Sequence, residues 1–150
     1  MTVRKCWIFD IDGTLADIEH RRHFVASKPK NWPAFNAAMV PDGVIPHTAD
    51  LLRQQFAQGM GIVLCSGRGS DARGFTEQWL DENSIPYHAL YMRAEKDYRS
   101  DYIVKSELLD RLRADGWNPQ AVVDDRLSVC RMWMNRGLFV FCVNQGFVEF

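Results

Sequence analysis

The sequence predicts an α/β fold, a parallel sheet covered by helices on both faces. Short apolar runs alternate with segments of helical periodicity, and the first run, CWIF, ends in two aspartates one residue apart. Two later apolar runs also end in polar residues. Strands that alternate with helices of this length are typical of parallel sheets, because the crossover helices pack on the faces of the sheet.

The elements follow one another without an internal repeat or an interdomain linker. Apolar residues recur at helical spacing between the apolar runs, and glycines follow two of these helical segments, as is common at helix C-termini. We expect strands at 5–9, 61–65, 89–92, 121–123 and 138–143, and helices at 46–58, 70–82, 101–114 and 127–135. The segment 17–43 breaks the alternation, and we interpret it as an insertion of two short helices, at 17–26 and 32–39.

Size and composition bound the function. The 150 residues, 47% hydrophobic and 25% charged, correspond to a single domain with an ordinary core over 1–150. A net charge of −1 excludes a bulk positive field for non-specific nucleic-acid binding. No apolar run approaches the ~18 residues of a membrane span, and the N-terminus lacks a signal-peptide pattern. We therefore expect a cytoplasmic protein without membrane contact, whose four cysteines (Cys6, Cys65, Cys130 and Cys142) are small buried hydrophobes.

Polar residues follow three of the predicted strands. In parallel α/β sheets ligands bind beyond the carboxyl ends of the strands, so these residues should share one cleft. The set comprises Asp10 and Asp12 after the first strand, Ser66 after the second, Asp124 and Asp125 after the fourth, and Lys105 near the start of the helix at 101–114. Independent acidic helix caps are the alternative, but every member falls at the same predicted edge.

Four neighbouring carboxylates cannot all stay ionised without a compensating cation. Oxygen ligands without His or Cys favour Mg²⁺ over zinc. A metal with a lysine, a serine and arginines indicates a phosphate-processing site. An aspartate can be the nucleophile of such a site, and the aspartate two residues further on can act as general acid and then as general base. Gly13 allows the sharp turn after the pair.

With these residues the sequence resembles the haloacid dehalogenase (HAD) superfamily of phosphotransferases. Asp10-Ile11-Asp12-Gly13-Thr14 is similar to its first motif, and Ser66, Lys105 and Asp124-Asp125 are similar to the second, third and fourth. The resemblance implies a Rossmann-like sheet with the first strand central, Asp10 as nucleophile and Asp12 as acid/base. It implies Mg²⁺ bound by Asp10, the Asp12 carbonyl and Asp124 with support from Asp125, and phosphoryl oxygens held by Ser66 and Lys105.

From Val3 onward the chain is similar to the 3′-phosphatase domain of phage polynucleotide kinase–phosphatases. The similarity includes the stretches IFDIDGTLA, GIVLCSGR and DDR, and it is weakest in the insertion. It implies a polynucleotide 3′-phosphatase with substrate contacts from Arg21, Gly67, Arg68, Arg93, Arg99, Asp101 and Arg126. No GxxxxGK[ST] motif is present, so we expect no 5′-kinase activity.

The space for a cap over the site is small. The segment after the first motif holds two short helices, and 93–100 holds only a loop. Small substrates usually need sequestration from water. An open site therefore favours either a bulky substrate such as a nucleic-acid end, or a homo-oligomer in which a partner shields the site. The sequence leaves open the oligomeric state, a separate kinase or ligase partner, and whether the substrate is DNA, RNA or a nucleotide.

Four other functions would use some of the same residues. A mononucleotidase or other small-molecule phosphatase would use the same chemistry and is favoured slightly by the neutral pI. A phospho-receiver signalling domain also combines acids, a hydroxyl and a lysine, but its adjacent acid pair follows the first strand, whereas here that strand is followed by Asp10 and Asp12. A degenerate binding module is disfavoured because every catalytic side-chain type is present. Dehalogenase chemistry is disfavoured because it needs neither Asp12 nor the Asp124-Asp125 pair.

Overall fold

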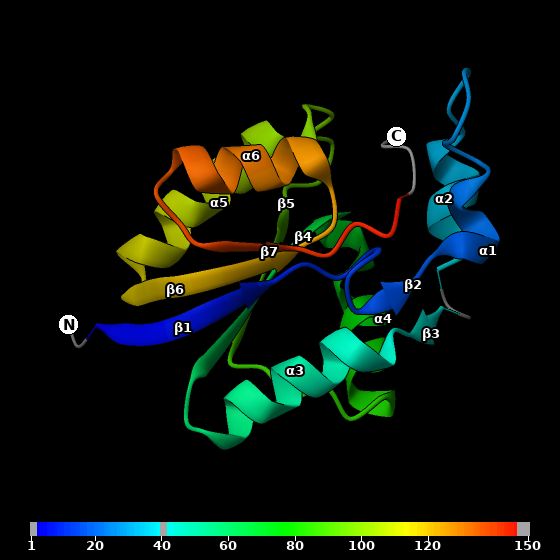
Figure 1. The fold of residues 1–150 in the computed structure, drawn as a ribbon. Helices are drawn as coiled ribbons and strands as arrows, with labels where there is room; N and C mark the ends of the chain where they lie inside the picture. The colour runs from blue at the N-terminus through cyan, green and yellow to red at the C-terminus, as the bar shows by residue number, and fades with distance from the viewer. Residues whose placement is uncertain (1–2, 40–41, 147–150) are drawn as a thin grey trace.

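The computed structural model describes residues 3–39 and 42–146. Its centre is a five-stranded sheet with the strand order β5-β4-β1-β6-β7 (Figure 1). The strands are β1 Arg4–Phe9, β4 Gly61–Gly69, β5 Ala89–Arg93, β6 Trp117–Asp124 and β7 Val140–Cys142. Every neighbouring pair in this sheet is parallel and β1 is central, so the predicted α/β class is confirmed.

Helices cover both faces of the sheet because alternate strand residues are apolar on each side. On one face lie α5 Asp101–Ala114 and α6 Leu127–Asn135, which pack on Ile8 and Val122. On the other face, α3 Pro46–Ala57 and α4 Arg73–Glu82 pack on Phe9 and Leu64. In Figure 1, α6 and α3 lie on opposite sides of the strands.

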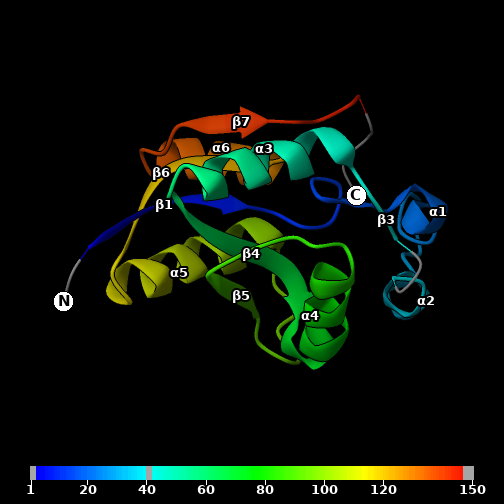
Figure 2. The ribbon, with the colours of Figure 1, turned by 90° about the horizontal axis from the view of Figure 1, so that it is seen from below.

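The insertion after β1 lies beyond the ends of the sheet strands (Figure 2). It contains α1 Glu19–Arg22 and α2 Trp32–Ala37, and its ends, β2 Ala16–Asp17 and β3 Gly43–Val44, pair as antiparallel strands. Both helices are shorter than expected. α1 has no side-chain cap at its N-terminus, whereas α2 begins where the Asn31 side chain accepts a hydrogen bond from the Ala34 N–H.

The other elements differ from the expected ranges mainly at their ends. β4 continues to Gly69 because a register shift between Ser66 and Gly69 lets it pair with the end of β5. The expected helix at 70–82 begins as a short 3₁₀ segment, η1 Ser70–Ala72, before α4.

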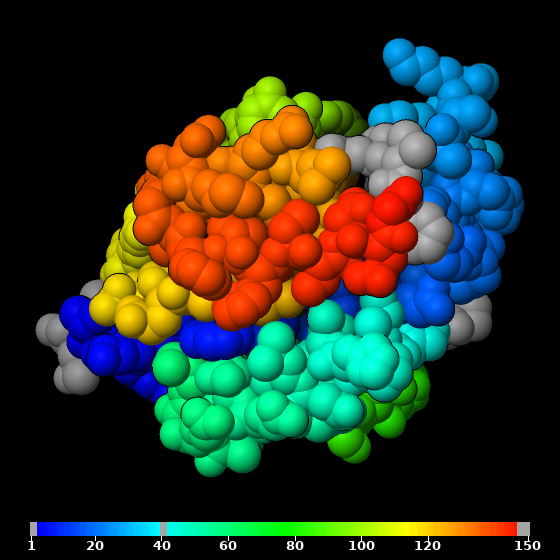
Figure 3. Space-filling model, viewed as in Figure 1, coloured from blue at the N-terminus to red at the C-terminus, as the bar shows by residue number. Residues whose placement is uncertain are grey.

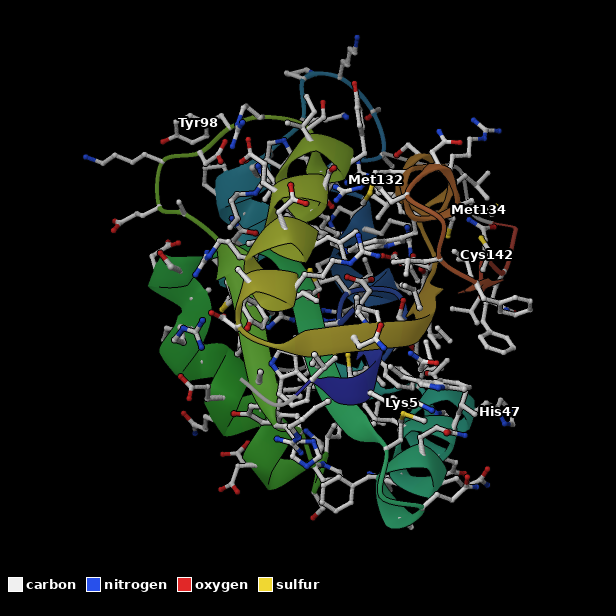
Figure 4. All side chains as sticks on the ribbon, turned by 90° about the vertical axis from the view of Figure 1, so that its left-hand side faces the viewer. Lys5, His47, Tyr98, Met132, Met134 and Cys142 are labelled. Atoms are coloured by element: carbon white, nitrogen blue, oxygen red, sulfur yellow. The ribbon has the colours of Figure 1, made fainter. Side chains whose placement is uncertain are left out.

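The expectation that all four cysteines are buried is wrong for Cys142. Cys142 is exposed at the end of the edge strand β7, and Figure 4 shows it at the surface beside α6. The orange-red segment that includes β7 lies at the surface in Figure 3. The other three cysteines are buried. None of the helices in the described part of the chain is long and apolar enough to span a membrane.

Candidate active site

The predicted catalytic residues meet at the carboxyl ends of the three middle strands. Asp10 directly follows β1, Ser66 lies in β4, and Asp124 ends β6. Lys105 reaches the same place from the second turn of α5. All four are buried. Hydrogen bonds join Asp10, Lys105 and Asp124 into one cluster, whereas the Ser66 hydroxyl accepts from the Arg68 N–H.

Lys105 is the cation at the centre of the cluster. Its Nζ donates to Asp10 Oδ1 at 2.8 Å and to Asp124 Oδ2 at 3.0 Å. Burial lowers the pKa of Lys105, but the charges of Asp10 and Asp124 outweigh burial and hold it well above its usual value. The ammonium group therefore stays charged and fixes the two carboxylates relative to each other.

The acids carry more charge than this one lysine compensates. Burial raises the pKa of Asp10 well above its usual range, and the neighbouring charge of Asp124 raises it further, against the lowering effect of Lys105. Burial and the charge of Asp124 likewise raise the pKa of Asp125 to about 6. Both shifts come first from burial and second from repulsion between the neighbouring carboxylates, and further positive charge would oppose both.

A cation fits this deficit. Asp10, Asp124 and Asp125 each offer a carboxylate oxygen, and these oxygens lie within 4.8 Å of one another. The ligands are hard oxygen donors of the kind that Mg²⁺ prefers. The Asp12 side chain is not part of this group, so of its atoms the main-chain carbonyl is the ligand that the sequence resemblance implies.

Gly13 and Thr14 hold Asp125 next to Asp10. The Thr14 hydroxyl is 3.1 Å from Asp10 Oδ2 and 3.2 Å from Asp125 Oδ1. Gly13 has a positive φ of 81°, and a Cβ there would overlap the Asp125 carboxylate. Thr14 was not among the residues expected from the sequence as functional, although it lies inside the first motif.

Two arginines hold the carboxylate of Asp12. Arg68 Nη2 lies 2.7 Å, and Arg21 Nη2 2.8 Å, from Asp12 Oδ1. Burial raises the pKa of Asp12, but the two guanidinium groups outweigh burial and hold it at about 2. Asp12 is therefore ionised and fixed in orientation.

Asp42, which the sequence did not single out, joins the same network. Its side chain is completely buried and accepts from Arg21 Nη2 at 2.7 Å and from Arg68 Nη2 at 3.3 Å. His20 Nε2 lies 2.6 Å from Asp42 Oδ1, and Trp79 Nε1 donates to the Asp42 carbonyl at 2.8 Å. The end of the insertion thereby fixes both arginines.

The guanidinium group of Arg21 makes its contacts inside the protein. It is completely buried, and besides Asp12 and Asp42 it donates to the Phe35 carbonyl at 3.2 Å. Its guanidinium also lies 4.3 Å from the centre of the Phe35 ring. Arg21 thus links α1 and α2 of the insertion to Asp12 of the first motif.

A second group of predicted residues surrounds Asp101 at the start of α5. Asp101 pairs with Arg93 of β5, and its Oδ2 lies 3.1 Å from Arg126 Nη1. Arg93 Nε also donates to the Gly67 carbonyl at 2.8 Å. A Cβ on Gly67 would overlap the Asp101 carboxylate, so this close approach requires glycine. The group comes from β4, β5, the first residue of α5 and the residue before α6, and Lys105 of the carboxylate cluster lies one turn further along α5.

Ser66 and Arg99 occupy contrasting positions. The Ser66 hydroxyl is buried and accepts from the Arg68 N–H at 3.1 Å. Arg99 lies in the exposed loop before α5, where Nη2 contacts Asp97 at 2.8 Å and Glu107 at 2.6 Å. The neighbouring Tyr98 projects from this loop (Figure 4). In this structure Arg99 faces the surface rather than the cluster.

Comparisons with known proteins identify this arrangement. The family model for the polynucleotide kinase PNKP phosphatase domain matches residues 4–147. A protein of Autographa californica nuclear polyhedrosis virus, described as a bifunctional polynucleotide kinase/RNA ligase, is 34% identical over 91 residues. That match covers 59% of this chain and 13% of the viral protein.

Solved structures agree in fold. A chain in the structure of the Pnkp1/Rnl/Hen1 RNA repair complex has a TM-score of 0.83 and 32% identity, over 97% of this chain and 44% of that chain. The class C acid phosphatase from Bacillus anthracis has a TM-score of 0.72 at 13% identity, over 99% of this chain and 70% of that chain, which shows the fold alone. This chain spans less than half the length of its viral and repair-complex relatives. It belongs to the PNKP phosphatase-domain family of the HAD superfamily and is a phosphomonoester hydrolase of that superfamily.

Proposed function

We propose that the chain removes 3′-phosphates from nucleic-acid ends in a Mg²⁺-dependent reaction with a phosphoaspartate at Asp10. One observation carries the proposal: Asp10 lies buried between Lys105 and the carboxylates of Asp124 and Asp125, two residues from an Asp12 held by arginines. A buried nucleophile beside a fixed cation and a site for a second cation suits attack on a phosphate dianion.

The reaction has two steps. A carboxylate oxygen of Asp10 attacks the phosphorus and the bond from phosphorus to the 3′ oxygen breaks. The leaving 3′ oxygen takes a proton from Asp12, which is ionised in the free protein and takes this proton up from solvent when the substrate binds. A water molecule then attacks the phosphoaspartate and gives a proton to Asp12, which releases inorganic phosphate and restores Asp10. Asp12 is suited to this exchange because Arg21 and Arg68 fix its position relative to Asp10.

The other site residues would bind and orient the phosphate. Lys105 supplies a permanent positive charge beside Asp10, and Ser66 a hydroxyl at the end of β4. Arg93 and Arg126 flank Asp101, next to Gly67 and Arg68, and we assign this group and Arg99 to substrate binding. Mg²⁺, when held by Asp10, the Asp12 carbonyl and Asp124 with Asp125 in support, supplies charge neutralisation for the transferring phosphoryl group.

The substrate class rests on the family and on the small insertion. The matching family is described as a polynucleotide kinase phosphatase domain. Within the described residues the helices of the insertion are short, α1 of four residues and α2 of six, and a small cap of this kind suits a polymer end better than an enclosed small substrate. The names of the relatives, a kinase/RNA ligase and an RNA repair complex, support cooperation with kinase and ligase activities. We also propose a cytoplasmic site of action, which suits the free buried thiols of Cys6, Cys65 and Cys130.

The test compares phosphate release from a 3′-phosphorylated oligonucleotide, a 5′-phosphorylated oligonucleotide and a 3′-mononucleotide. Each is measured with Mg²⁺, with EDTA and with the Asp10→Asn variant. We expect release chiefly from the 3′-phosphorylated oligonucleotide, dependent on both Mg²⁺ and Asp10. Preference for the mononucleotide would identify a nucleotidase, and release by the Asp10→Asn variant at the wild-type rate would exclude the proposed nucleophile.

A further inference from the structure

Trp133 of α6 is a hydrogen-bond donor to the carboxylate cluster. Its indole Nε1 donates to Asp124 Oδ2 at 3.1 Å, and the side chain is completely buried. The sequence pattern assigns it to the apolar face of α6, and it does pack there, against the sheet face that includes Ile8 and Val122. Packing alone does not require the N–H to point at a carboxylate.

Asp124 is held on both oxygens. Oδ1 accepts from the main-chain N–H groups of Asp125 at 2.8 Å and Arg126 at 3.3 Å. Oδ2 accepts from Lys105 at 3.0 Å and from Trp133. The backbone donors fix one oxygen, so the position of the second oxygen depends on two side chains.

These two side chains are not equivalent. Lys105 divides its contacts between Asp10 and Asp124, so its ammonium group positions the two carboxylates together rather than Asp124 alone. An indole ring carries a single N–H, and here that hydrogen points to Asp124. The ring is also enclosed in the core, and the Cys130 thiol of the same helix lies 3.5 Å from the Asp124 carbonyl.

We propose that Trp133 is a positioning residue for the metal, holding the Asp124 carboxylate toward Asp10 and Asp125. The proposal rests on the metal dependence proposed above. A neutral donor suits this role, because it orients the carboxylate without cancelling the negative charge that attracts a cation. Partners that orient metal ligands typically change metal affinity by about 10–100-fold when they are removed.

The test measures metal affinity directly. Mn²⁺ and Mg²⁺ binding to the full chain is followed by isothermal titration calorimetry for wild type, Trp133→Phe and Trp79→Phe. Trp79 is the matched control, because it is also a buried helical tryptophan whose N–H donates to a neighbouring aspartate, but to the Asp42 main chain rather than to a metal-site carboxylate. We expect the dissociation constant to rise about tenfold for Trp133→Phe and less than about twofold for Trp79→Phe.

Thermal unfolding in EDTA separates a positioning role from a structural one. If both variants lose similar stability in EDTA but only Trp133→Phe binds metal more weakly, the positioning role is supported. A folded Trp133→Phe protein with wild-type metal affinity would overturn it. If Trp133→Phe does not fold, benzothienylalanine at position 133 replaces the N–H by sulfur in a ring of the same shape, and its metal affinity decides. Failure of the wild-type chain to bind either metal would instead refute the proposed metal dependence.

Discussion

Arg68 and Asp12 form a forked ion pair at the entrance to the carboxylate cluster. Arg68 Nη2 and Nε lie 2.7 and 3.1 Å from Asp12 Oδ1, and Nε lies 3.3 Å from Oδ2. The two residues are 56 positions apart in the sequence and come from the ends of neighbouring strands, β1 and β4. Such a planar two-point contact fixes orientation as well as charge, so the Asp12 carboxylate is held ionised and in one orientation, two residues from Asp10.

Asp12→Asn should therefore slow the reaction by a factor that depends on whether the leaving group needs a proton. On a 3′-phosphorylated oligonucleotide the rate should fall about 10²–10⁴-fold, the usual contribution of a general acid or base. On p-nitrophenyl phosphate the first step should be nearly unaffected, because nitrophenolate leaves without a proton. Rapid mixing should then show a burst of about one nitrophenolate per active site, followed by slow turnover.

The control for this prediction is Asp50→Asn. Asp50 lies on the surface of α3, where it pairs with Arg53, and its loss should leave both rates unchanged. Equal slowing of both substrates by Asp12→Asn, without a burst, would show that Asp12 does not transfer the proton.

Asp42→Asn should destabilise the protein strongly. The variant leaves Arg21 and Arg68 buried with less compensating charge, and breaking a buried ion pair from one side typically costs about 3–5 kcal/mol. The matched control is Asp110→Asn, which removes a pair with Arg136 at the surface and should cost less than about 1 kcal/mol. Urea unfolding of both variants measures the difference, and a loss below about 1 kcal/mol for Asp42→Asn would contradict the role of this network.

The strand-end residues were predictable, whereas Asp42 was not. Asp10 and Asp124 follow apolar runs, and the carboxyl ends of parallel strands must share an edge, so local patterns were sufficient to bring them together. Asp42 follows no strand of the sheet, and its partners Arg21 and Arg68 are 21 and 26 residues away. Such a contact depends on how the insertion packs, and no periodic pattern encodes it.

The hydrogen bond of Trp133 and the exposure of Cys142 also lay beyond what the sequence pattern predicts. Trp133 lies at an apolar helical position, so the pattern correctly predicts burial but contains no information about the direction of its N–H. Cys142 lies in an apolar run that was expected to be covered. It lies in the edge strand β7, whose end is left uncovered, so that Phe141 and Cys142 are both exposed. A single sequence reveals neither which strand is outermost nor how far the helices cover it.

The pH dependence of stability should include a contribution from His88. Burial and the charge of Arg4 lower the pKa of His88 in the folded protein, and its Nδ1 accepts a hydrogen bond from the Ile62 N–H at 2.9 Å. A histidine whose pKa is lowered on folding contributes stability that is fully present above the unfolded value near 6.5 and is lost as the pH falls through the lower folded value.

The measurement compares wild type with His88→Gln. Urea unfolding measures the stability of both proteins at pH 7.5 and at pH 5, and we expect the wild type to lose more stability than the variant between these values. We also expect NMR titration of the wild type to give a pKa for His88 below 6.5. Parallel pH profiles for the two proteins, or a titration midpoint above 6.5, would contradict the lowered pKa.

Gly13→Ala should damage the site far more than the fold. Gly13 and Gly137 have nearly the same positive φ, 81° and 83°, so alanine at either position should cost about 1 kcal/mol of backbone strain. Only at Gly13 does the added Cβ meet the Asp125 carboxylate, whereas at Gly137 nothing lies within 4 Å. Gly137→Ala is therefore the matched control for strain without displacement of a ligand. In EDTA, we expect the two variants to lose similar thermal stability. Gly13→Ala should also lose the stabilisation by Mg²⁺, and its phosphatase rate should fall about 10²-fold. Gly137→Ala should keep near-wild-type values for both Mg²⁺ stabilisation and phosphatase rate. Equal activity of the two variants would mean that the position of Asp125 does not limit the reaction.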